Sequence, residues 1–418
     1  MTKIPELLSP AGSLNKAKFA LDFGADAIYC GTNIFALRTY RDNFDMSELE
    51  KIVNYAHQNK KFVYVALNIF AHNFHLEIVK KALGELKKIK PDAFIISDPG
   101  VFSLAKKIAP RIPIHISTQA NTLNIESVKF WKRQGAERII LARECNLKEI
   151  KEIHEKVRGI ELETFIHGAQ CMAYSGRCML TAALGNQGRS NVGTCKNACR
   201  WQYRELEEFK RPGIKVPIKE DLQGTYFFNA NDMCMIEYLP ELIKAGIASF
   251  KIEGRGRSEF YVAQVTRAYR QALDLIKNNA KNYKKEVEKL KKQLEKSNQR
   301  EFDEGFFFEA PRQTTAHGKM NTPYIFAGKL IKKIDDYTGK FLIINEIYKG
   351  EKVNILTPKD QYEMKIDKLI LASNKFYESR REKEVESVHG GNKDEIILKL
   401  PRKIQERTII WLDKSRRK

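Results

Sequence analysis

Five cysteines in the middle of the chain have spacing that suits a metal site. They occur as Cys171-x6-Cys178-x16-Cys195-x3-Cys199, followed by Cys234. Zinc ribbons use two close C-x2-4-C pairs, and only Cys195 and Cys199 form such a pair. Four thiolates from well-separated loops suit an iron–sulfur cluster instead. The alternative is that some thiols are buried as small hydrophobic groups, as we expect for Cys30 and Cys145.

These cysteines follow a regular alternation of short apolar strands and amphipathic helices. The candidate strands are 6–9, 27–31, 62–68, 93–98, 112–118, 138–143, 162–167 and 249–254. Residues 15–23 and 127–134 have helical apolar spacing, and Ser47 with Glu50 has the pattern of a capping box. Eight strands alternating with helices over about 250 residues predict a closed (β/α)8 TIM-type barrel. An open doubly wound sheet is the alternative, but the first strand is not followed by G-x-G-x-x-G.

A barrel of this kind carries its chemistry at the carboxyl ends of its strands. The polar residues expected there include Asn68, Gln119, Arg143, His167, Glu253, Arg255 and Arg257. Imidazole, guanidinium and carboxylate groups are costly to bury without a partner. We therefore predict that Arg143, His167 and Glu253 are catalytic, with His167 pointing into the mouth of the barrel.

The domain organisation follows from where this alternation stops. The barrel is predicted over 1–280, with a cysteine-rich insertion over 169–234 after the seventh strand, including a hairpin or loop at 209–226. A helix at 235–245 precedes the eighth strand. A charged helix and linker, 281–323, contains three consecutive phenylalanines, 306–308, that we expect a neighbouring domain to bury. Residues 324–418 alternate with a period of two, which predicts a small all-β domain, a barrel or a sandwich.

The composition favours a protein that meets polyanions. The net charge is +21 and the sequence pI is near 9.5, so nucleic acid is the first candidate partner, although a lysine-rich proteome also produces basic proteins. There is no apolar run of membrane-spanning length and no signal-peptide pattern, so we expect a cytoplasmic protein without a membrane partner. Seven cysteines in such a chain indicate ligands or buried thiols rather than disulfides.

The stretch Glu163-x-Phe165-x-x-Gly168-Ala169-x-Cys171-x4-Gly176-x-Cys178 resembles the signature of the collagenase-like peptidase family, family U32 of the peptidases of unassigned catalytic type. The stretches ELLSPAG, NVGTCKNACRWQY, KIEGRGRS and REFDEGFFF also match, so the resemblance covers nearly the whole chain. The best understood bacterial members of this family are oxygen-insertion proteins that carry a 4Fe-4S cluster and hydroxylate a wobble uridine in tRNA, a cytidine in ribosomal RNA or the ubiquinone ring. The length, the CxxxCRWxY element and the terminal β domain are most similar to those of the tRNA uridine hydroxylases.

The resemblance implies a set of roles for individual residues. The cluster ligands would be Cys171, Cys178, Cys195 and Cys234, with Cys199 as the alternative to Cys234. Prephenate, a small dicarboxylate, would be the hydroxyl source for 5-hydroxyuridine, and tRNA would be the partner. From their positions at strand ends, we predict in addition that Arg143, Arg255 and Arg257 hold carboxylates, that His167 and Glu253 move protons, and that Asn68 and Gln119 line the substrate site. The oligomeric state is left open.

The family name also implies proteolysis, which is the main alternative. The chain has no H-E-x-x-H helix and no G-x-S-x-G elbow. A cysteine peptidase would need a thiolate beside a histidine, and Cys171 with His167 is the evident candidate. A thiol bound to iron is not available as a nucleophile. The further alternatives are hydroxylation of ribosomal RNA or another substrate, and a non-catalytic RNA-binding iron–sulfur protein.

Overall fold

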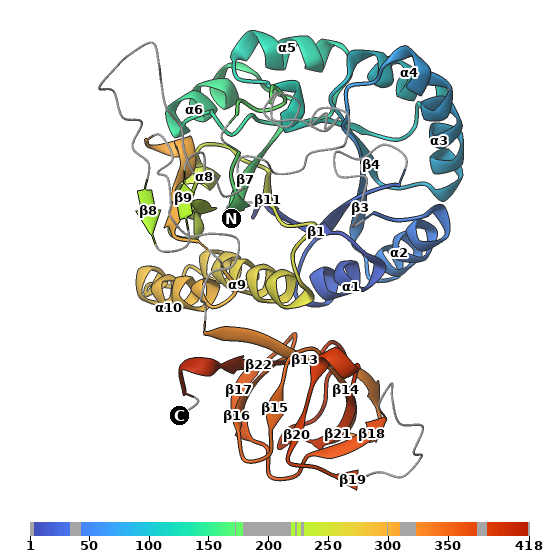
Figure 1. Ribbon diagram of the computed structural model, residues 1–418. Coiled ribbons are helices and arrows are strands. Elements are labelled where there is room, and N and C mark those ends of the chain that lie inside the picture. The colour runs from blue at the N-terminus through green and yellow to red at the C-terminus, as the bar shows by residue number, and fades with distance from the viewer. Residues whose placement is uncertain are drawn as a thin grey trace.

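Eight parallel strands close into the predicted (β/α)8 barrel, shown in Figure 1. The computed structural model describes residues 4–33, 43–171, 173–178, 219–221, 224–226, 230–298, 300–309, 323–373 and 383–416. The sheet order is β11-β1-β2-β3-β4-β5-β6-β7, and β11 also pairs with β7, which closes the ring. The strands are β1 Glu6–Ala11, β2 Ala27–Gly31, β3 Phe62–Leu67, β4 Ala93–Ile96, β5 Ile114–Ile116, β6 Arg138–Ile140, β7 Glu161–Ala169 and β11 Ser249–Ile252. The predicted fold class is confirmed.

Helices surround this ring and alternate with its strands. They are α1 Leu14–Asp22, α2 Met46–Gln58, α3 Leu76–Ile89, α4 Pro99–Ile108, α5 Ile125–Arg133, α6 Leu147–Lys156, α8 Leu239–Lys244 and α9 Glu259–Lys277, with short 3-10 helices η1 Asn73–His75, η2 Thr118–Ala120 and η5 Ile236–Tyr238. The capping box predicted at Ser47 belongs to Asp45 and Glu48, because Asp45 accepts the Glu48 backbone N–H at 2.7 Å. Within the described residues, no helix has both the length and the apolar character of a membrane span.

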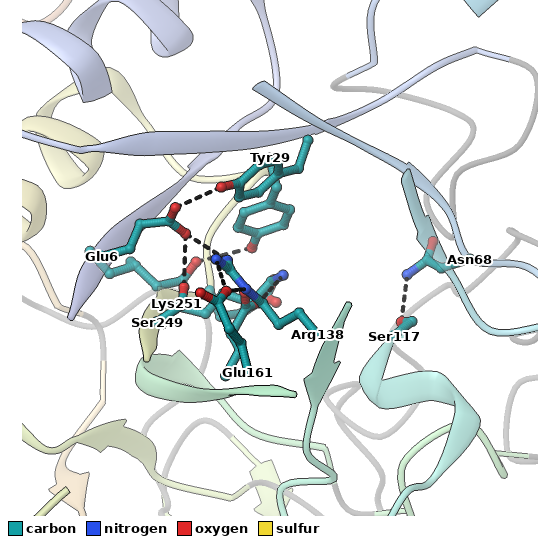
Figure 2. A network of polar contacts seen from close by, with 12 residues as sticks. Glu6, Tyr29, Asn68, Ser117, Arg138, Glu161, Ser249 and Lys251 are labelled. Carbon is teal, nitrogen blue, oxygen red and sulfur yellow. Dashed lines mark hydrogen bonds and ion pairs between the residues drawn. The ribbon is translucent and has the colours of Figure 1, made fainter. Parts of the chain in front are cut away.

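Charged side chains lie inside the barrel toward the amino ends of its strands (Figure 2). Arg138 Nη1 lies 2.7 Å from Glu6 Oε1 and 3.1 Å from Glu163 Oε2. Lys251 Nζ lies 2.8 Å from Glu163 Oε1, and the Tyr64 hydroxyl donates to Glu6 at 2.6 Å. Buried charges require such pairing, and this end of a TIM-type barrel normally serves stability. We therefore assign this network to the barrel core and not to the site.

Two short strands extend the sheet at the carboxyl end of β7. β10, Asp232–Cys234, runs antiparallel to the end of β7, and β12, Phe302–Asp303, runs parallel to β10. The sequence predicts an insertion and a linker here, because strands of three and two residues carry too little periodicity to detect. β8, Lys219–Asp221, pairs antiparallel with β9, Gly224–Tyr226. This pairing agrees with the hairpin that is one of the two predictions for 209–226. Cys195 and Cys199 lie outside the described residues.

The C-terminal part is an antiparallel sheet domain with its own core, as predicted. Its strands are β13 Tyr324–Lys333, β14 Thr338–Ile343, β15 Ile347–Tyr348, β16 Lys352–Leu356, β17 Gln361–Lys365, β18 Ile370–Ser373, β19 Lys383–Glu384, β20 Ser387–Val388, β21 Glu395–Lys399 and β22 Ile409–Asp413, followed by η8 Lys414–Arg416, and η7 Gly390–Asn392 precedes β21. α10, Tyr283–Glu295, packs beside α9, and η6, Gly305–Phe307, follows β12. Phe307 is buried in the barrel core, whereas Phe308 is exposed, so the barrel covers only part of the phenylalanine run.

Candidate functional site

Arg143, Glu253 and Cys171 meet where β6, β11 and β7 end. Arg143 Nη2 lies 3.3 Å from Glu253 Oε2, and Arg143 Nη1 lies 3.9 Å from Cys171 Sγ. The guanidinium carbon is 4.1 Å from the centre of the Phe165 ring, so the ring supports the cation from one side. Both charged side chains retain some exposure, 12% for Arg143 and 17% for Glu253. The structure thus joins two residues predicted to be catalytic to one predicted cluster ligand.

The backbone of Glu253 is held by β7 and α9. Its N–H donates to the His167 carbonyl at 2.9 Å, and its carbonyl accepts from the Tyr261 hydroxyl at 2.9 Å. Gly168 has φ of +100°, and a Cβ there would lie only 2.6 Å from the Glu253 carbonyl oxygen. A glycine is therefore required for β7 to pass this close to Glu253.

Residues 171 and 173–178, which we call the cysteine loop, pack against the loops that follow β5 and β6. The Ser175 N–H donates to Glu144 Oε1 at 2.7 Å, and the Arg143 N–H donates to Ser175 Oγ at 3.4 Å. Gly176 has φ of +78°, and a Cβ there would lie 1.9 Å from the Gln119 carbonyl oxygen. Gln119 thus meets the cysteine loop through its backbone. The sequence alone predicts no role for Ser175 or Glu144, although Ser175 lies within the signature.

His167 does not face the mouth, which corrects the prediction about its direction. Its Nδ1 lies 3.3 Å from the Tyr269 hydroxyl on α9, and its ring also contacts Tyr261 and Phe302. The cause is a β-bulge: Lys251 pairs with Phe165 but Ile252 pairs with His167, so the strict alternation from Glu163 is broken. Burial, together with the positive charge of Arg257, lowers the pKa of His167 to about 3.

The displacement of His167 also removes the pair that a cysteine peptidase would use. Cys171 is exposed beside Arg143, whereas His167 is fully buried against α9. A nucleophilic thiol and its base must lie within hydrogen-bond reach. Among the residues that the structure describes, this geometry gives no support to the peptidase alternative.

The cysteines expected to bind a cluster fall into two described groups. Cys171 is exposed and Cys178 is partly exposed on the cysteine loop, where thiolates suit an iron–sulfur cluster. Cys234 is buried, faces α9 with its Sγ 3.7 Å from the Tyr269 hydroxyl, and its pKa is raised by burial to about 11. Within the described ranges, no three His, Cys, Asp or Glu side chains are placed to hold a metal ion. Cys171 and Cys178 are therefore accessible on the cysteine loop, whereas Cys234 is buried against α9.

The remaining predicted substrate residues lie around the mouth with partners of their own. Arg257 Nη2 lies 3.0 Å from Oδ2 of the buried Asp232. Arg255 is buried, and its carbonyl accepts from Lys16 Nζ at 3.3 Å. Asn68 donates to Ser117 Oγ at 3.5 Å. The Arg257 guanidinium therefore helps to balance the charge of the buried Asp232.

Residues 300–309 form a strap that supports the start of the cysteine loop. Arg300 Nη1 lies 2.9 Å from Asp232 Oδ1, and Asp303 Oδ1 accepts from Gln170 Nε2 at 2.6 Å. Gln170 directly precedes Cys171, so Asp303 fixes the direction in which the cysteine loop leaves β7. The family motif REFDEGFFF is the signal in the sequence that points to this supporting role. Its position after the barrel strands instead predicts a linker.

The fold and the site define a barrel protein with an arginine–carboxylate pair and exposed thiols at its mouth. The model of peptidase family U32 matches residues 12–317, and the chain belongs to that family. The tRNA hydroxylation protein P of Haemophilus influenzae is 35% identical, over 88% of this chain and 89% of its own length. The tRNA hydroxylation protein P1 of Bacillus subtilis is 36% identical, over 86% of this chain and 85% of its own length. A Methanocaldococcus jannaschii protein named as an uncharacterized protease is 38% identical, over 74% of each chain.

Proposed function

We propose that this chain is a tRNA-modifying enzyme that forms 5-hydroxyuridine at the wobble position, with a 4Fe-4S cluster as cofactor and prephenate as hydroxyl source. The observation that carries the proposal is the Arg143–Glu253 pair beside the exposed Cys171 at the mouth. Support comes from the relatives named as tRNA hydroxylation proteins, which align along most of the chain.

Arg143 and Glu253 give the mouth of the barrel two functions, carboxylate binding and proton acceptance. Arg143 presents guanidinium N–H groups to a carboxylate, and guanidinium matches a carboxylate with two parallel hydrogen bonds. Phe165 restricts the motion of the guanidinium by lying against its face. After the C5–O bond forms, Glu253 accepts the proton of C5, and the electron pair of the broken C5–H bond restores the C5=C6 double bond. Prephenate is the two-electron acceptor in this step, because it keeps the electron pair of its broken C–O bond and takes up a proton. In the absence of substrate, Arg143 and Glu253 neutralise each other.

The cluster would be held by Cys171, Cys178 and Cys195, with either Cys199 or Cys234 as the fourth ligand. When bound, such a cluster supplies one-electron redox chemistry at the mouth. Anaerobically purified Cys199→Ser and Cys234→Ser variants decide the fourth position. The variant that lacks the fourth ligand should lose most of its iron. The other variant should retain the iron content of the wild type.

The reaction is tested with purified components. The reconstituted protein is incubated without dioxygen with unmodified tRNA and prephenate whose ring hydroxyl carries ¹⁸O, and nucleosides are analysed by mass spectrometry. The proposal expects 5-hydroxyuridine that contains ¹⁸O. Unlabelled product would contradict the role of prephenate, and absence of product with an iron-replete protein would contradict the assigned reaction.

A further inference from the structure

The cysteine loop exposes a tyrosine ring at the mouth. Tyr174 is 62% exposed, although a tyrosine ring gains considerable free energy from burial. Its backbone carbonyl accepts from the Arg177 N–H at 2.9 Å, and the next residue, Ser175, is bound by Glu144. Gly176 then packs on the Gln119 backbone. The ring is thus presented to solvent by a turn that is fixed on one side, which is the arrangement of a binding surface.

A second exposed aromatic group lies at the same end of the barrel. Phe74, 68% exposed, follows the carboxyl end of β3, and its ring stacks on His72 with centroids 5.6 Å apart and planes 12° apart. The opposite, amino end of β3 carries Phe62, which is 47% exposed. The two ends of one strand therefore provide a test position and a matched control.

We propose that Tyr174 stacks on a base of the single-stranded RNA loop bound at the mouth, and that Phe74 with His72 forms a second stacking platform farther out on the rim. This inference rests on the proposed function, because it takes the bound loop to be the anticodon loop of tRNA.

The chemistry of RNA recognition explains why the mouth needs such a ring. A base that enters a barrel mouth must leave its stack, and this unstacking costs free energy. Proteins that bind single-stranded RNA recover stacking on aromatic side chains, and every base offers a face for it. Arg177, exposed three residues after Tyr174, adds positive charge where the phosphate backbone would pass. The turn that carries this ring is bound to the Arg143 backbone through Ser175, so the ring is placed to stack on the target uridine or its neighbour.

Binding of an unmodified anticodon stem–loop RNA to the full chain, followed by fluorescence anisotropy, tests the inference. Stacking on one aromatic ring predicts that Tyr174→Ala weakens binding by about 5- to 150-fold. Tyr174→Trp should bind within about twofold of the wild type, because it keeps an aromatic face, whereas Tyr174→Leu should bind as weakly as the alanine variant. Phe74→Ala should weaken binding, and the control Phe62→Ala should not.

Three outcomes would overturn the inference. Wild-type affinity in Tyr174→Ala would show that the ring makes no contact with the RNA. Wild-type affinity in Tyr174→Leu would show a simple hydrophobic contact, as with a protein partner. With the unaltered protein, a 5-iodouridine probe at the wobble position should form a photo-crosslink within the peptide that contains Tyr174, and crosslinks found only elsewhere would refute the stacking. Failure of the wild type to bind the stem–loop at all would instead contradict the proposed function.

Discussion

At the scale of single residues, the site depends on an arginine and a carboxylate that come from different strands. Arg143 and Glu253 are 110 positions apart in the chain, and their side chains meet at 3.3 Å. Their positions at strand ends could be predicted from the sequence, because the alternation of strands and helices locates the mouth. The partners of each group could not, because hydrogen bonds such as that between Tyr261 and the Glu253 carbonyl depend on the packed helix.

Glu253→Gln tests the proton-accepting role. The amide keeps the size of the side chain but does not accept a proton, so the rate of 5-hydroxyuridine formation should fall by about 10²- to 10⁴-fold. Single-turnover kinetics with reconstituted protein measures this rate. Glu126→Gln, at an exposed position of α5, is the control and should retain the wild-type rate. A Glu253→Gln variant with the wild-type rate would exclude Glu253 from proton transfer.

His115 makes stability depend on pH. Burial is the main cause that lowers its pKa to about 3 in the folded chain; the positive charges of Arg138 and Lys251 contribute to this lowering and the negative charge of Glu163 opposes it. In the unfolded chain the imidazole binds a proton near pH 6.5, so the stability present above that pH is lost as the pH falls toward 3. This histidine should remove about 1.4 kcal/mol of unfolding free energy between pH 7.5 and 5.5. Urea unfolding at pH 7.5 and at pH 5.5 measures this decrease in unfolding free energy. In His115→Gln the decrease should be smaller by about 1.4 kcal/mol. The same decrease in the variant as in the wild type would contradict a contribution from His115.

At the scale of elements, the end of β7 decides how the site is assembled. The sequence predicts the strand itself, because its apolar residues are bounded by polar and glycine-rich segments. It does not predict the bulge opposite Lys251 and Ile252, because a bulge depends on pairing between distant strands. A strict alternation from Glu163 would turn His167 inward, and the bulge turns it toward α9. For the same reason β10 and β12, which pair only through the end of β7, were not foreseen.

Gly176→Ala tests the docking of the cysteine loop. The new Cβ would lie 1.9 Å from the Gln119 carbonyl oxygen, and φ of +78° adds backbone strain, so the loop must shift. A displacement of about 1 Å at a reacting centre can lower activity by about 100-fold, and we expect a loss of that size in 5-hydroxyuridine yield. The matched control is Gly84→Ala in α3, where a Cβ meets nothing within 4 Å and should stabilise the helix by about 0.5–1 kcal/mol. Full activity of Gly176→Ala would refute this role for the loop.

At the scale of the whole molecule, the C-terminal domain is attached to the barrel through a shared aromatic cluster. Trp411 of β22 lies 5.9 Å from Phe260 of α9, measured between ring centroids, and Phe19 of α1 belongs to the same buried group. Lys329 and Glu259 form an ion pair of 2.7 Å across the same contact. In Figure 1 the domain lies beside α1 and α9. A basic domain fixed in this position extends the surface on which a polyanion could bind.

Trp411→Ala tests this attachment. Truncating a fully buried tryptophan should lower the free energy of unfolding by about 3–5 kcal/mol and expose the aromatic faces of Phe260 and Phe19. Chemical denaturation followed by far-UV circular dichroism, which does not rely on tryptophan fluorescence, measures the decrease in unfolding free energy. Tyr348→Ala, at an exposed position of the same domain, should cost about 0.5 kcal/mol or less. Equal effects of the two substitutions would contradict a shared core between the domains.

The nucleoside content of cellular tRNA tests the central claim most directly. The gene is expressed in a host that lacks every endogenous relative, and total tRNA nucleosides are quantified by mass spectrometry. We predict that the wild-type chain restores 5-hydroxyuridine and its derivatives, and that the Glu253→Gln chain, expressed at the same level, does not. Absence of these nucleosides with the wild-type chain, or equal amounts with and without it, would contradict the assignment to tRNA.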